Sequence, residues 1–91
     1  MHLGTLSGTG IVFVGGTRIG TGRYEIHVSR DDSDWKSAIG TLHAEWRLLE
    51  KLFNADSAKL RLESGEEIPI YVTEQFEDRA DIRITGPVPG F

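Results

Sequence analysis

Histidine is the residue type in this chain best suited to metal binding or proton transfer, because an imidazole changes charge near neutral pH and is a common metal ligand. His27 falls on the polar face of a predicted strand, and His43 could join it, whereas His2 stands near the first residue, where we expect disorder. The histidine spacing matches no zinc motif, and the chain has no cysteine to supply thiolates. We therefore interpret His27 as a solvent-facing strand residue and predict neither a metal site nor a cofactor.

Aspartates at 31, 32 and 34 could open a calcium-binding loop, whose ligands alternate along the chain. Counting from Asp32 puts Lys36 at the fifth position and Ser37 where such a loop requires glycine. A solvated acidic turn explains this segment better.

The glycine-rich segments GTGIVFVGG and GTRIGTGR could suggest phosphate binding, which requires a strand followed by a helix whose amides point at the anion. These glycines flank predicted strands instead, so we interpret them as turns and bulges. No side chain has the surroundings of a catalytic nucleophile, and no carboxylate pair falls in an apolar segment that would shift its pKa. We predict that the chain is not an enzyme.

Cations and one aromatic at outward strand positions are candidate contacts for a partner molecule. These residues are Lys59, Arg61, Tyr71 and Arg83, and Arg79 would extend them into a basic stripe. A barrel that binds oligonucleotides would use such a face for base stacking and phosphate contacts. Ten Lys and Arg against fourteen Asp and Glu, however, give a net charge of −4, which disfavours a nucleic-acid partner. Solvated ion pairs are the simpler interpretation.

Trp35 and the last four residues, VPGF, are candidate contacts for a protein partner. Trp35 follows the acidic turn at the start of a predicted strand, where it is either core or an exposed anchor. The VPGF segment either folds back as a plug or offers Phe91 and its carboxylate to another chain.

Length and composition predict one cytoplasmic domain. Ninety-one residues, of which 38% are hydrophobic and 26% charged, suffice for a single core over residues 1–91. No apolar run approaches the roughly 20 residues of a membrane-spanning helix, and the first ten residues do not resemble a secretory signal. The absence of cysteine excludes disulfides. We therefore expect no membrane partner.

The clearest period-two pattern, at 57–73, predicts the β-hairpin that presents most of these candidates. A three-residue loop over 63–65, ending in glycine, pairs Leu60 with Ile68 and puts the apolar residues of both strands on one face. A two-residue loop would pair apolar with polar residues instead.

The same register has two consequences for the outer surface of this hairpin. Arg61 lies opposite Glu67, an attractive pair. Pro69 falls within the second strand, which predicts either a sheet edge or an interrupted ladder. An open edge could accept a strand from another chain.

The N-terminal third predicts a second hairpin. A strand over 6–14, buried on both faces, leads through a Gly-Gly turn into a strand over 17–30, which sets Val12 opposite Ile19. The apolar phase of the second strand then changes, so we predict a β-bulge or bend at the glycines of 20–22.

Between the hairpins we predict a third strand over 35–42 and a helix over 45–53. The helical spacing of apolar residues also allows a helix that begins at Leu42 with Thr41 as its N-cap. Asn54 is expected to end the helix in a left-handed conformation.

A last strand over 80–85 completes a mainly β fold, a small six-stranded antiparallel barrel or roll with one short helix between the third and fourth strands. This order resembles the OB-fold with an additional C-terminal strand, and an SH3-like barrel fits nearly as well. The PilZ family is also six-stranded, but Arg18 and Arg23 do not have the spacing of its RxxxR motif, so none of its residues is carried over.

From these features we predict a non-enzymatic binding or assembly module that docks on a protein partner or self-associates. One alternative is an OB-like oligonucleotide-binding domain that uses the basic and aromatic candidates. The other is a barrel that holds a small apolar ligand under a helical lid formed by Trp46, Leu49 and Phe53.

Overall fold

The computed structural model describes residues 2–30, 36–84 and 88. Its elements are, in order, β1 (His2–Val14), β2 (Thr17–Arg30), β3 (Lys36–His43), α1 (Trp46–Phe53), β4 (Ala58–Arg61), β5 (Glu67–Gln75) and β6 (Arg79–Ile84). The predicted six strands are confirmed, as is the helix between the third and fourth. Trp35, the acidic turn at 31–34, the predicted strand end at Thr85 and the terminal Phe91 lie outside the described residues.

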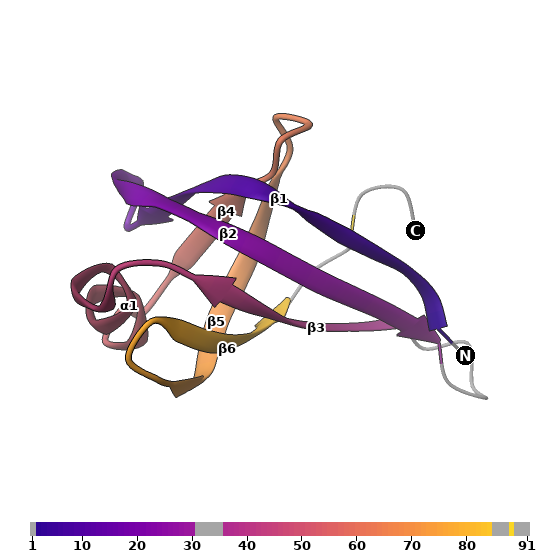
Figure 1. Cartoon of the computed structure of the whole chain (residues 1–91). Helices are drawn as coiled ribbons and strands as arrows, with labels where there is room; N and C mark the ends of the chain where they lie inside the picture. Colours follow the sequence, from indigo (N-terminus) through magenta and orange to yellow (C-terminus); the bar gives the residue numbers. More distant parts are fainter. Residues whose placement is uncertain (1, 31–35, 85–87, 89–91) are drawn as a thin grey trace.

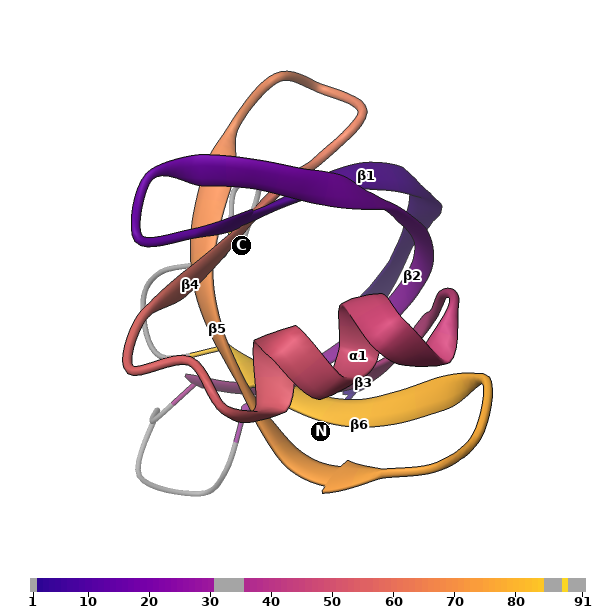
Figure 2. The same cartoon turned by 90° about the vertical axis from the view of Figure 1, so that its left-hand side faces the viewer.

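The strands close into a barrel in the order β1-β2-β3-β6-β5-β4. Two antiparallel three-stranded meanders, β1-β2-β3 and β4-β5-β6, are joined by the antiparallel pairs β1–β4 and β3–β6 (Figure 1). The helix α1 lies across one end of the barrel (Figure 2). The predicted small six-stranded antiparallel β-barrel is therefore confirmed.

The β4–β5 hairpin has the predicted register. Leu60 pairs with Ile68, Arg61 pairs with Glu67, and the Leu62 N–H donates to the Glu66 carbonyl oxygen at 2.8 Å, which leaves a three-residue loop. The last loop residue, at position 65, is a glycine with a φ of 92°, a left-handed conformation that other residues adopt only at a cost.

Pro69 does not mark a sheet edge, because β5 pairs with both β4 and β6. It lies opposite Lys59, one residue before the first described β5–β6 pair, Ile70 with Ile84. Of the two predicted alternatives, the open edge is therefore wrong, and Pro69 stands where the described β5–β6 ladder begins.

The β1–β2 hairpin confirms the Gly-Gly turn and corrects the register that follows it. Val14 pairs with Thr17 as predicted, but Val12 pairs with Gly20 rather than with Ile19. A register shift between Val12 and Phe13 absorbs one residue, so the predicted bulge exists and begins before the glycines at 20 and 22. The outer face of β1 is also less covered than predicted, because Phe13 is only partly buried.

The N-terminal end of β1 contradicts the predicted disorder of His2. The strand begins at His2 rather than at Leu6, and His2 pairs with Ser29 of β2. The alternation of polar and apolar residues is interrupted there by a second register shift, between His2 and Gly4. This irregularity explains why the sequence pattern gave no strand signal before Leu6.

The helix packs on the barrel with its leucines and not with its aromatics. Leu49 is fully buried and Leu48 and Leu52 nearly so, whereas Trp46 and Phe53 are each 50% exposed. The predicted lid of Trp46, Leu49 and Phe53 is therefore wrong in two of its three members.

The ends of α1 also differ from expectation. Thr41 lies in β3 and is not an N-cap, and Glu45 precedes the helix without a capping side-chain hydrogen bond. Asn54 ends the helix with a φ of −88°, not in a left-handed conformation. Its side-chain amide instead donates to the Glu50 carbonyl oxygen at 2.9 Å, and the Asn54 backbone N–H donates to the same oxygen at 3.2 Å.

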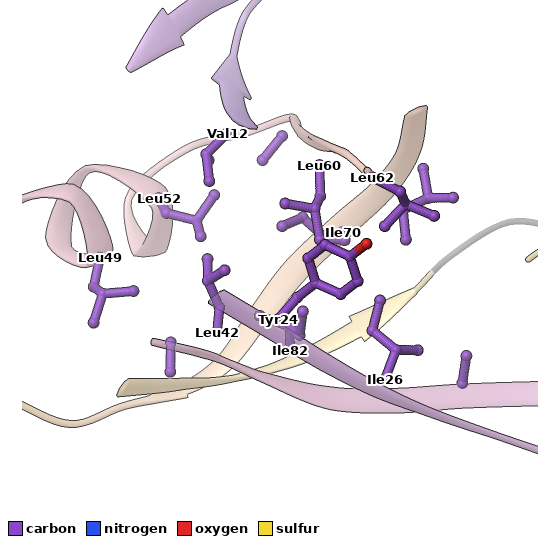
Figure 3. Close-up of a cluster of buried hydrophobic side chains, with 14 of the residues drawn as sticks. Val12, Tyr24, Ile26, Leu42, Leu49, Leu52, Leu60, Leu62, Ile70 and Ile82 are labelled. Atoms are coloured by element: carbon purple, nitrogen blue, oxygen red, sulfur yellow. The ribbon is translucent and has the colours of Figure 1, made fainter. Parts of the chain in front are cut away.

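One apolar core fills the barrel and continues beneath α1 (Figure 3). Both meanders contribute fully buried side chains, such as Val12 and Leu42 from the first and Leu60 from the second. Val88 of the C-terminal VPGF segment also belongs to this core. No charged side chain is buried in the described parts of the chain, so charged groups gather on the outer surface.

Candidate functional site

The outer surface of the barrel carries its candidate contact residues in rows that run across the strands. Alternate residues of a strand face outward, and the register sets outward residues of neighbouring strands side by side. Three such rows cross β2, β3 and β6, separated by two residues along each strand, which is about 7 Å. The rows differ in charge and exposure, so each is described by itself.

The row farthest from α1, which we call the exposed row, consists of Ile39, Arg83 and Tyr71. Ile39 lies opposite Arg83, and Arg83 lies opposite Tyr71. Ile39 is 53% exposed and Tyr71 46% exposed, although both side chains are large and hydrophobic. His27 extends the row on β2, opposite Ile39. The fold thus brings together two of the predicted contact residues, Tyr71 and Arg83.

Two rows of opposite charge lie between the exposed row and α1. The cationic row is formed by Arg23 and Arg79, with His43 between them, and the acidic row by Glu25, Asp81 and Glu74. The acidic row separates the cationic row from the exposed row, at a spacing shorter than the ~8–10 Å Debye length of physiological salt. This outer face therefore alternates in charge and is not a basic stripe.

The other predicted cations, Lys59 and Arg61, lie on β4. Arg61 donates from Nη2 and Nε to Glu67 Oε2 at 2.7 and 3.1 Å, which confirms the predicted pair. The guanidinium carbon also lies 4.8 Å from the centre of the Phe13 ring. Arg61 is therefore engaged by groups of its own chain. Trp35, the remaining predicted contact, lies outside the described residues.

A hollow of about 320 Å³ opens between the first three strands and the β4–β5 turn. It is lined by Ser7, Gly8, Thr9, Arg23, Tyr24, Glu25, His43 and Glu63. The Tyr24 hydroxyl accepts a hydrogen bond from the Glu63 N–H at 3.1 Å, which ties the turn to β2. Because the lining is mostly polar and includes no residue of α1, this hollow is not the predicted apolar site beneath the helix.

Sequence reasoning missed Ile39 as a contact residue. Its strand showed only weak alternation, with Ile39 and Trp35 predicted on one face and Ala38 and Leu42 on the other. The structure shows Ala38 and Leu42 buried and Ile39 outward. The signal that could have identified Ile39 is therefore a large apolar residue on the face of β3 that points away from the buried Ala38 and Leu42.

Neither a known protein family, nor a curated protein, nor a solved structure matches this chain. Within the segments that the structure describes, no helix is both long and apolar enough to span a bilayer. No group of three or more His, Asp or Glu side chains suited to a metal ion occurs in those same segments.

Proposed function

We propose that this chain is a non-enzymatic binding module that docks on a protein, either another protein or a second copy of itself, through the exposed row. The observation that carries the proposal is the adjacency of Ile39, Arg83 and Tyr71 on three neighbouring strands, with both hydrophobic members about half exposed. Aromatic residues and arginine are enriched at the centres of protein interfaces, where a few such anchors supply most of the binding energy. The absence of cysteine agrees with a cytoplasmic location, which we also propose.

Charge supports a protein over a nucleic acid as the partner. The whole chain carries a net charge of −4, and Glu25, Asp81 and Glu74 run alongside the exposed row. Asp81 is two residues from Arg83 on the same strand, about 7 Å along it, so a phosphate bound at Arg83 would be close enough to this carboxylate for repulsion at physiological salt. A protein partner can match the alternating rows with groups of opposite charge, which favours specificity.

The test compares proteins retained by the immobilised chain with those retained by two double variants. Ile39→Ser with Tyr71→Ser removes the exposed row, and Trp46→Ser with Phe53→Ser is the matched control, because its residues are equally exposed but lie on α1. We expect a retained protein, or a second copy, to bind the parent and the control and to be lost from the row variant. Loss of each anchor should cost about 1–2 kcal/mol, or roughly tenfold in affinity. Equal retention by all three chains would contradict the proposal.

An amide-resolved NMR titration with short single-stranded oligonucleotides distinguishes the nucleic-acid alternative. If the chain docks on a protein as proposed, we expect its spectrum to stay unchanged on addition of oligonucleotide at both low and moderate salt. Salt-sensitive shifts clustered at Tyr71 and Arg83 would instead assign the same row to oligonucleotide binding, because phosphate contacts weaken steeply with salt.

A further inference from the structure

Four side chains at the start of the β1–β2 pair form one hydrogen-bonded chain. The Thr5 hydroxyl oxygen lies 3.2 Å from His2 Nε2 and 3.2 Å from His27 Nδ1, and His27 Nε2 lies 3.0 Å from Glu25 Oε1. The two imidazole rings are 5.9 Å apart between centres. Two imidazole nitrogens therefore converge on the same hydroxyl group.

The fold builds this arrangement with a backbone irregularity. Thr5 lies directly opposite His27, and Glu25 is the next outward residue on β2. In a regular strand His2 and Thr5 would face opposite sides, because they are three residues apart. The register shift between His2 and Gly4 absorbs Leu3, whose side chain packs against the core, and so turns His2 outward beside Thr5.

The hydrogen bonds determine which imidazole nitrogen can bind a cation. Glu25 is a carboxylate and only accepts, so the neutral imidazole of His27 donates from Nε2 and carries its lone pair on Nδ1. Thr5 then donates to His27 Nδ1 and accepts from His2 Nε2. A carboxylate on the far nitrogen is the usual way in which a protein fixes the tautomer of a metal-binding histidine.

We propose that His2 Nε2 and His27 Nδ1 bind one divalent transition-metal ion, with Glu25 as the positioning residue that orients His27. Metal–imidazole bonds are about 2.0–2.1 Å long, so the ion takes the position between the rings that the Thr5 hydroxyl now bridges. His2 moves its proton to Nδ1 when it binds. The site has two protein ligands and is exposed, so water completes the coordination. It adds metal binding to the proposed docking function, and one of its ligands, His27, lies at the end of the exposed row.

Imidazole ligands define the class of metal. They suit Zn²⁺, Cu²⁺ and Ni²⁺, with Cu²⁺ the tightest of these, whereas Mg²⁺ and Ca²⁺ prefer oxygen ligands. A carboxylate, imidazole and hydroxyl in sequence also occur in hydrolases. Here neither Thr5 nor His27 lines the 320 Å³ hollow, and the two imidazole nitrogens converge on one point, so metal binding is the chemistry that the geometry favours.

The test is a Zn²⁺ titration of the whole chain, followed by NMR of the histidine ring C–H groups. We expect saturable shifts of His2 and His27, none of His43, and none of any ring with Mg²⁺. His43 is the matched control because it is also exposed on the outer face but stands between Arg23 and Arg79. Glu25→Gln should weaken Zn²⁺ binding about tenfold or more.

Variants of single histidines decide whether the two rings share the ion. His2→Gln and His27→Gln should each abolish saturable binding, and His43→Gln should leave it unchanged. Because all three positions are on the surface, an amide spectrum of each variant checks that the fold is intact. Binding that survives His27→Gln but not His2→Gln would place the metal on the N-terminal segment alone and overturn the proposal, as would an unperturbed parent chain.

Discussion

At the residue scale, Tyr24 connects the two halves of the barrel. Its ring lies in the core with only 6% exposed (Figure 3). Its hydroxyl accepts the Glu63 N–H from the β4–β5 turn, thirty-nine residues further along the chain. In the sequence, Tyr24 shares its alternating phase with the apolar Ile26 and Val28, but nothing there indicates this distant polar contact. One hydroxyl thus fixes the end of the second meander against the first.

Tyr24→Phe should lower the free energy of unfolding by about 1 kcal/mol, because the partly buried Glu63 N–H loses its acceptor while the ring keeps its packing. Tyr71→Phe is the matched control, since Tyr71 is 46% exposed on the outer face, and its effect should stay within about 0.5 kcal/mol. Urea denaturation of the three chains measures both values. Equal stability of the two variants would contradict a structural role for the Tyr24 hydroxyl.

At the element scale, the apolar pattern of α1 predicts the position of the helix but not which of its side chains are buried. The spacing of apolar residues predicted α1 to within one residue of its start, because two turns of amphipathic helix give a clear signal. The same pattern assigned Trp46 and Phe53 to the buried face. Those aromatics lie at the margin of the face centred on Leu48, Leu49 and Leu52. The rotation of the helix about its own axis decides whether they are buried, and that rotation depends on packing against the neighbouring strands.

Leu49→Ala should therefore destabilise the fold by about 2–5 kcal/mol, because a fully buried leucine leaves a cavity beneath the helix. Trp46→Ala should cost about 1 kcal/mol or less, since half of that side chain is already in water. Thermal or urea unfolding of both variants gives the comparison. A larger loss for Trp46→Ala would mean that the aromatic, and not the leucine, anchors α1.

At the element scale, the close approach of β2 and β3 requires a glycine at position 40. A Cβ atom at Gly40 on β3 would clash with the backbone carbonyl oxygen of Glu25 on β2. Gly40→Ala should cost about 2–3 kcal/mol, because backbone cannot move aside cheaply. Gly8→Ala is the control, since its Cβ meets only the flexible end of the Glu63 side chain and should cost less than about 1 kcal/mol. Similar unfolding midpoints for the two variants would show that the strands can separate without loss.

At the scale of the whole molecule, the strand pairs that close the barrel could not be predicted from sequence patterns. Turns and hairpins are local, so the loop over 63–65 and the Gly-Gly turn were predicted correctly from their residues alone. The pairs β1–β4 and β3–β6 join segments far apart in the chain, and their register depends on the packing of the complete core. The exposed row exists only because β3 and β6 pair, which is why Tyr71 and Arg83 could be named as candidates but not placed beside Ile39.

The most direct test of the docking surface is photo-crosslinking from the exposed row. A benzoyl-phenylalanine replaces Ile39 in one chain and Thr21, an exposed outward residue of β2 away from the row, in the control chain. We predict that the probe at position 39 forms a covalent adduct with a protein or a second copy, which disappears with Arg83→Ala and Tyr71→Ala, and that the probe at position 21 does not. An adduct of equal yield from both positions, or one that nuclease removes, would contradict protein docking through the exposed row.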